Sequence, residues 1–219
     1  MLNPSCVYTA SDLIGLIKGA CAQASYWFPD GSAPYDLFLF GVRDTANPDA
    51  WNDALGCVYR TTRGGELQLQ LWPGTTDPGA PTLLQPQNPA GAAVIAPGQH
   101  RAVWKLGTHR GRPAFVQNRV IPVLRDADRD RVIDPSDRAV EGFYGINGHD
   151  AYRDGLPVVG EASAGCVVWH SQADHVSALQ LAQQQERSIG VTTFSLTLFD
   201  IRTFRSLAPV LKAALTAVS

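Results

Sequence analysis

The sequence predicts a β-rich α+β fold, a sandwich or barrel covered by a few helices. Twenty glycines and fifteen prolines in 219 residues indicate many turns, which favours short strands over a helical bundle. Several apolar or alternating runs have the length of strands, and only three segments show clear helical periodicity. Hydrophobic residues make up 45% of the chain, enough for a sizeable core.

Three helices are expected, each from apolar residues that recur at helical spacing. The first covers residues 11–23, with Ser11 as its N-cap, and the second covers 171–187, capped by Ser171. The third covers 203–218, where Pro209 marks a break.

Seven strands are expected along the chain, and a turn at Gly64-Gly65 joins two of them as a hairpin. Residues 167–169, directly after Cys166, are expected to form one more short strand. The predicted strands cover residues 35–42, 55–60, 67–72, 99–106, 114–117, 120–124 and 191–199. Residues 73–98 are rich in proline and glycine, so short strands at most are expected there. The expected organisation is an N-terminal helical or loop segment (1–34), a main domain (35–200) and a C-terminal helix (201–219) packed on that domain.

Charge and hydropathy exclude several classes of partner. The net charge is −2, and no broad basic surface pattern indicates nucleic-acid binding. No run approaches the ~20 apolar residues that span a bilayer, so no membrane partner is expected. The start of the chain lacks the basic segment of a signal peptide, so we expect synthesis without one.

The four cysteines form no C-x-x-C pair and no metal-like spacing with the five histidines. Free thiols made in a reducing compartment are therefore expected, although two disulfides are arithmetically allowed. Cys6, Cys21 and Cys57 stand beside apolar residues and are expected to be inert.

Cys166 differs from these because it follows Ser163-Ala164-Gly165 and lies seventeen positions after His149. A cysteine nucleophile reacts as a thiolate, so its pKa must be lowered or a base must lie beside it. Histidine is the natural base near neutral pH. From residue types alone, a core thiol and a turn histidine remain the commoner alternatives.

The segment resembles the signature of the L,D-transpeptidase catalytic domain (YkuD-fold) family. That signature is a His-Gly or His-Ser, a spacer, and Ser/Thr-His-Gly-Cys followed by an apolar residue and Arg or Asn. The resemblance is closer to a variant branch found in phage-type and other bacterial proteins, with G-I-N-I/L-H-R before W-S-A-G-C-Q. Earlier blocks of that branch have ordered counterparts here, at Lys105-Leu106-Gly107-Thr108-His109, Ala114-Phe115-Val116-Gln117, Arg125-Asp126 and Gly145-Ile146-Asn147-Gly148-His149.

The resemblance implies an L,D-transpeptidase-like β-sandwich or barrel over residues 35–200. It makes Cys166 the nucleophile and His149 its general base, with Ser163 and Gly165 shaping the nucleophile turn. The amides of Gly165 and Cys166 become candidate oxyanion donors. No cofactor is required for this chemistry.

Departures from the two patterns bear on substrate preference more than on the Cys–His pair. Ala164 replaces the family's histidine, and Val168 replaces its arginine or asparagine, which removes a contact to a substrate carboxylate. Against the closer branch, the differing positions are Gly148, Asp150, Ala162 and Val167.

Three further residues are candidates for substrate binding. His109 is expected to line the cleft, with a surface turn histidine as the alternative. Tyr144 and Trp169 flank the pair in sequence and are candidates to pack on a peptide, with a place in the core as the alternative.

His170 and His175, at the start of the second helix, are expected to be exposed. A zinc site using Asp150 or Asp154 is disfavoured because no second histidine has metal spacing.

Residues 126–137 place acids at positions 1, 3, 5, 9 and 12 of a twelve-residue loop, which is the ligand spacing of a calcium site. The five acids are Asp126, Asp128, Asp130, Asp134 and Asp137. Arg131 replaces the usual glycine at position 6, and Asp137 replaces the usual glutamate. A solvated charged turn and a structural calcium site both remain open.

The leading hypothesis is a cysteine acyl-transfer enzyme acting on peptidoglycan stem peptides through a thioacyl intermediate. Hydrolysis as a carboxypeptidase or endopeptidase is expected more than cross-linking, because no leader, anchor or wall-binding repeat is seen. Such a protein would act on the cell wall or in the periplasm after release or secretion, as a lysin or effector does. The alternative is a non-catalytic wall-binding or structural module that keeps the fold.

Overall fold

The computed structural model describes residues 8–29, 31, 33–130, 133 and 137–216, and its main feature is a closed eight-stranded barrel. Around the barrel the strands are β1 (Phe38–Arg43), β11 (Thr193–Asp200), β5 (Gly98–His109), β6 (Arg112–Gln117), β9 (Gly148–Asp150), β10 (Val167–Trp169), β3 (Gln68–Thr75) and β2 (Asp53–Tyr59). The pairs β1–β11 and β9–β10 are parallel and the other pairs are antiparallel. The expected β-rich α+β class is thereby confirmed, with a mixed barrel as its core.

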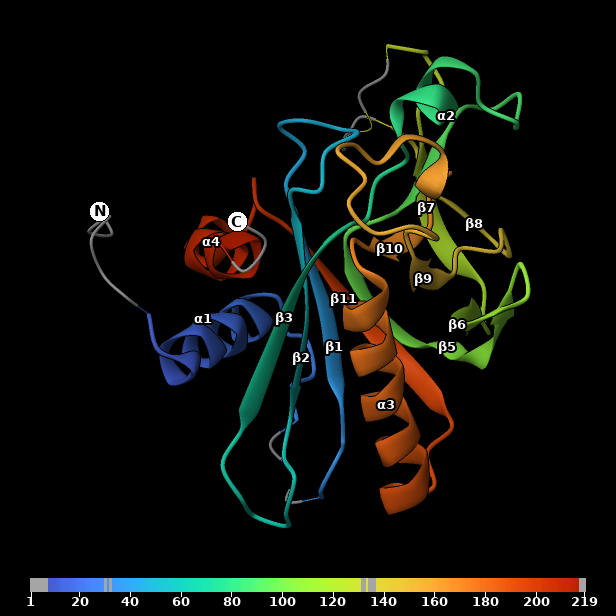
Figure 1. The fold of residues 1–219 in the computed structure, drawn as a ribbon. Coiled ribbons are helices and arrows are strands. Elements are labelled where there is room, and N and C mark those ends of the chain that lie inside the picture. The colour runs from blue at the N-terminus through green and yellow to red at the C-terminus, as the bar shows by residue number, and fades with distance from the viewer. Residues whose placement is uncertain (1–7, 30, 32, 131–132, 134–136, 217–219) are drawn as a thin grey trace.

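A smaller antiparallel sheet lies beside the barrel. It consists of β4 (Ala93–Ile95), β7 (Ile121–Arg125) and β8 (Val140–Gly142), with β7 in the centre. Figure 1 shows this sheet on the same side of the molecule as the short strands β9 and β10. Both sheets therefore contribute to the region where the candidate site residues lie.

The long helices cover two different surfaces of the barrel. The helices α1 (Ala10–Gln23) and α4 (Ala208–Thr216) pack on side chains of β1 and β2, whereas α3 (Gln172–Ile189) contributes to the other large apolar cluster. Figure 1 shows α1 and α4 together on one side of β1–β3 and α3 on the other. Alternation along β1 explains this, because Phe38 and Phe40 face α1 and α4 while Leu39 faces the α3 cluster.

Several sequence-based details were wrong or missed. Thr9, not Ser11, caps α1, because its hydroxyl accepts from the Asp12 amide while Asp12 accepts from the Thr9 amide in a capping box. Pro209 does not break the last helix, since α4 begins at Ala208 and tolerates proline in its first turn. The short helix α2 (Ala80–Leu84) and the three-residue strands β8 and β9 were not predicted. Among the described residues, no helix has the length and hydropathy to cross a membrane.

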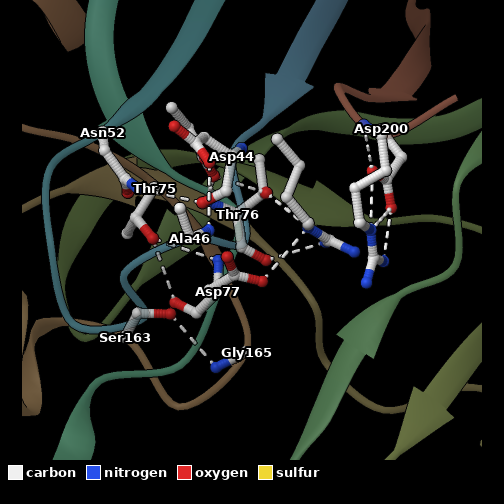
Figure 2. A network of polar contacts seen from close by, with 12 residues as sticks. Asp44, Ala46, Asn52, Thr75, Thr76, Asp77, Ser163, Gly165 and Asp200 are labelled. Carbon is white, nitrogen blue, oxygen red and sulfur yellow. Dashed lines mark hydrogen bonds and ion pairs between the residues drawn. The ribbon is translucent and has the colours of Figure 1, made fainter. Parts of the chain in front are cut away.

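A buried network of charged groups joins the barrel to the loop before α2. Asp53 is fully buried and accepts hydrogen bonds from the Asp44 amide at 2.7 Å and from the amide and hydroxyl of Thr76, each at 2.6 Å. Arg43 donates to the Thr76 hydroxyl at 2.8 Å and pairs with Asp77 at 3.1 Å. The Thr75 hydroxyl accepts from the Asp77 amide at 3.0 Å, and Figure 2 shows these two residues next to Ser163.

The same segment contacts the turn that carries Cys166. The Gly79 amide donates to the Ser163 carbonyl at 3.0 Å. A side chain at Gly79 would overlap the carbonyl of Gly160, so glycine is required for this close approach. The charged network thus fixes one side of the Ser163–Cys166 turn to the barrel.

We expect Arg43→Leu to lower the free energy of unfolding by about 3 kcal/mol or more, because Asp77 would lose its buried ion-pair partner and Thr76, which donates to Asp53, would lose a hydrogen bond. Urea unfolding followed by circular dichroism measures this loss. The exposed Arg205 is the control, and its replacement by leucine is expected to cost less than about 0.5 kcal/mol. Equal effects of the two substitutions would contradict a structural role for the network.

Candidate active site

One cavity of about 290 Å³ lies between the barrel and the smaller sheet. Cys166, His149, His109 and Tyr144 all line it, so the structure brings together four of the residues singled out from the sequence. Its wall also includes residues that sequence reasoning did not assign to the site, among them Gln87, Asn88, Arg110, Arg125, Tyr152 and Glu161.

The turn before Cys166 is closed by Ser163. The buried Ser163 hydroxyl donates to the Cys166 carbonyl at 2.9 Å and accepts from the Gly165 amide at 3.1 Å. Gly165 has a φ of 120°, and a Cβ there would overlap the Ala93 carbonyl of β4. Because the Gly165 amide is used inside the turn, the expectation that it donates to an oxyanion is not supported, and the Cys166 amide remains the candidate.

The Cys166 thiol is half-buried and contacts the loop that leads into β9. The Asn147 amide donates to Sγ at 3.4 Å, and the thiol lies 3.6 Å from the Gly145 carbonyl. Burial raises the pKa of the Cys166 thiol, while the Asn147 amide and the positive charge of Arg110 act in the opposite direction. The resting thiol is therefore protonated near neutral pH.

His149 is held in the central position of β9. In the parallel pairing of β9 with β10, His149 lies opposite Val168, two residues beyond Cys166. Its Nδ1 lies 2.7 Å from the Asp150 carbonyl, which can only accept, so Nδ1 carries a proton. Burial lowers the pKa of His149 to about 4, with a smaller contribution from the neighbouring His109 and His175, so the ring is neutral at pH 7 and Nε2 is free to accept a proton.

Two aromatic rings pack against His149. His109 stacks on it with ring centroids 4.8 Å apart, and Tyr152 packs at 4.9 Å. The Asn147 side-chain amide lies 3.0 Å from His109 Nδ1, and its oxygen accepts from the Gln117 amide at 2.9 Å. His109 is therefore part of the cavity wall, as expected, and its ring restricts the movement of His149.

Gln117 and Trp104 hold the loop before His149 in place. The Gln117 side chain accepts from the amides of Tyr144 and Ile146 at 3.1 and 2.9 Å and donates to the Gly142 carbonyl at 3.2 Å. The Trp104 indole donates to the Ile146 carbonyl at 3.1 Å. The sequence did not assign these roles, although Gln117 ends a largely apolar strand and belongs to one of the blocks on which the resemblance rests.

A second group of polar side chains, from β6 and α3, surrounds Asp150 at the end of β9. Asp150 pairs with Arg112 at 2.6 Å, and its other oxygen accepts from the Tyr152 amide at 2.7 Å. His175 lies 4.0 Å from the Asp150 carboxylate and is buried, so the prediction that it is exposed was wrong. The helix α3 packs against β9 and β10, and His175 packs on the Trp169 ring with centroids 5.2 Å apart, which explains its burial.

The two aromatic candidates differ in their positions. Tyr144 lines the cavity, with the Arg125 guanidinium 4.8 Å from the centre of its ring. Trp169 does not line the cavity, because it is buried in the core and packs on Phe115 with ring centroids 5.8 Å apart. Trp169 therefore belongs to the core, which was the alternative to a place at the substrate.

The acidic loop is described only in part. Asp126, Asp128 and Asp130 have ligand oxygens within 4.8 Å of one another, with Asp126 buried and the other two exposed. Asp137 is half-buried and is not in this group, and Asp134 lies outside the described residues. Three carboxylates of this kind suit a hard cation such as calcium, and a structural calcium site stays a prediction.

The other thiols are remote from this chemistry. Cys21 and Cys57 are free and buried, and burial raises the pKa of Cys21 to about 12 and that of Cys57 further. Cys6 lies outside the described residues. Cys166 is thus the one thiol in the described part of the chain that faces a cavity.

Comparisons with known proteins add no family assignment: no protein-family model, no curated protein and no solved structure matches the chain.

The close contact of Gly165 with β4 can be tested by comparing the stability of two glycine-to-alanine variants. We expect Gly165→Ala to cost more unfolding free energy than Gly190→Ala, because both positions have positive φ but only the first would overlap backbone. Gly190 caps α3 in open space, so its alanine variant is expected to lose about 1–2 kcal/mol. Urea unfolding measures both, and equal losses would contradict the tight contact of the turn with β4.

His149 predicts a specific pH dependence. Its pKa is lower in the folded chain than the ordinary 6.5, so the native state binds fewer protons and its stability falls as pH drops from 6.5 to 4. The lowered pKa corresponds to roughly 3 kcal/mol at most. We expect His149→Gln to lose less stability than the wild type between pH 7 and pH 4 in urea unfolding. Parallel pH profiles for the two proteins would show that His149 titrates normally.

Proposed function

We propose that the chain is a cysteine acyl-transfer enzyme that acts on peptidoglycan stem peptides through a thioacyl intermediate. One observation carries the proposal: Cys166 and His149 line the same cavity, and the Asp150 carbonyl fixes the proton of His149 on Nδ1. Nε2 is thereby left as a base in a neutral ring. The resemblance of the surrounding blocks to L,D-transpeptidases supports the reaction class and the substrate.

In the proposed reaction, Sγ attacks a peptide carbonyl carbon while the thiol proton moves to His149 Nε2. Negative charge develops on the carbonyl oxygen, where the Cys166 amide is the candidate donor. The C–N bond then breaks, and the imidazolium returns its proton to the leaving amine. Water, activated by the same neutral histidine, attacks the thioester and releases Cys166 as a thiol.

Hydrolysis is proposed in preference to cross-linking. The cavity volume of about 290 Å³ is at the lower end of the range for ligand sites, which suits one peptide segment and a water better than two peptide strands. The reaction needs no cofactor. The proposed place of action is the cell wall or periplasm, after release or secretion.

A second candidate function is a non-catalytic module that binds or organises the wall. One observation favours it: the pKa of Cys166 is raised while that of His149 is lowered, so the pair holds no preformed thiolate at rest. In an enzyme, the same neutral pair transfers its proton only when the carbonyl is attacked.

Incubation with purified peptidoglycan fragments distinguishes the two functions. The wild type is expected to release shorter stem peptides that mass spectrometry identifies, with water added at the cut bond. His149→Gln is expected to lower the rate by about 10²-fold or more, since it removes the general base. Gln keeps the size and polarity of the site, so a folded variant with full activity, or a wild type with no product, would refute the proposal.

A further inference from the structure

Among the described residues, two arginines line the cavity that holds Cys166, and one of them has no polar partner in this part of the chain. Arg125 donates to the Gly91 carbonyl at 2.9 Å and packs on Tyr144, so it is part of the wall. Arg110 lines the same cavity and has no hydrogen bond or ion pair with any described residue. Glu161 is the acidic residue that the described part of the lining contains, and no ion pair joins it to either arginine there.

Arg110 also has an unusual backbone conformation. It forms a two-residue hairpin loop with Gly111 between the paired His109 and Arg112. Both loop residues have positive φ, 49° for Arg110 and 78° for Gly111, as in a type I′ turn. That turn favours asparagine, aspartate or glycine, so an arginine at its first position is costly for the fold.

The side chain of Arg110 reaches toward the reactive groups. Its guanidinium lies 5.4 Å from the centre of the Tyr152 ring, and Tyr152 packs on His149. The nearby Arg112 is already paired with Asp150, so its charge is compensated. The uncompensated positive charge at this end of the cavity is therefore that of Arg110.

We infer that Arg110 binds a carboxylate of the substrate next to the carbonyl that Cys166 attacks, so that the site selects peptides with a free acid at that position. The inference builds on the proposed function and adds a specificity residue to it. Guanidinium groups recognise carboxylates through charge and paired N–H donors, which suits a group at the mouth of a half-buried site.

The test uses two small alkylating agents, one of which carries a carboxylate where the other carries a neutral amide. Iodoacetate and iodoacetamide both react when the Cys166 thiolate displaces iodide and forms a thioether. We expect the wild type to favour the anionic reagent, and Arg110→Asn to lower the iodoacetate-to-iodoacetamide rate ratio by about fivefold or more. Asparagine suits the type I′ turn, so this variant is expected to fold at least as stably as the wild type.

Arg119→Asn removes the same charge from an exposed residue outside the cavity lining and is expected to leave the ratio unchanged. An unchanged ratio in Arg110→Asn would overturn the inference, as would an equal decrease in both variants. The ratio of alkylation rates can be measured without any peptide being cleaved. Its outcome therefore tests the role of Arg110 whether or not the proposed enzymatic activity is found. With an active enzyme, Arg110→Asn is also expected to lower kcat/KM for a stem peptide ending in a free carboxylate, but not for its carboxamide.

Discussion

Parallel pairing between β9 and β10 places the two candidate side chains, Cys166 and His149, in one part of the barrel. The register sets Gly148 opposite Val167 and His149 opposite Val168, and the Val167 amide donates to the Asn147 carbonyl at 2.9 Å. Cys166 lies immediately before this ladder, so the same few hydrogen bonds fix both its backbone and that of His149. The strands are only three residues long, and their positions depend on the supports around them.

Those supports come from three directions. The charged network around Asp53 and the Gly79–Ser163 contact hold the Ser163–Cys166 turn from the barrel side. Gln117 holds the loop before His149, and Asp150 joins β9 to β6 through Arg112. Most of these groups are buried and polar, so removing one partner leaves another unsatisfied, which is costly. This explains how an irregular, glycine-containing loop region can present a defined site.

The electrostatics of the site indicate a neutral resting pair. Burial raises the pKa of the Cys166 thiol and lowers that of His149, and both shifts favour the uncharged forms. A pair of this kind avoids the cost of holding two charges in a half-buried cavity. In the proposed reaction, charge forms only when the carbonyl is attacked. Arg110, at the same cavity, would help to stabilise the thiolate as well as a bound carboxylate.

The sequence predicted the helices and long strands because their periodicity extends over several turns or pleats, as in α3 and β11. It did not predict β8 or β9, since three residues are too few for a pattern. Cys166 and His149 were found through motif spacing and resemblance. The role of Gln117, the burial of His175 and the place of Arg110 depend on contacts between segments distant in sequence, which no local pattern contains.

The most direct test of the account is whether Cys166 becomes acylated by a stem peptide. Wild-type protein is mixed with peptide, quenched in acid within one turnover, digested and analysed by mass spectrometry, with Cys166→Ala as the control. The account predicts an acyl adduct on the peptide containing Cys166, absent from the control. Turnover without any adduct on Cys166, or turnover that persists in Cys166→Ala, would contradict it.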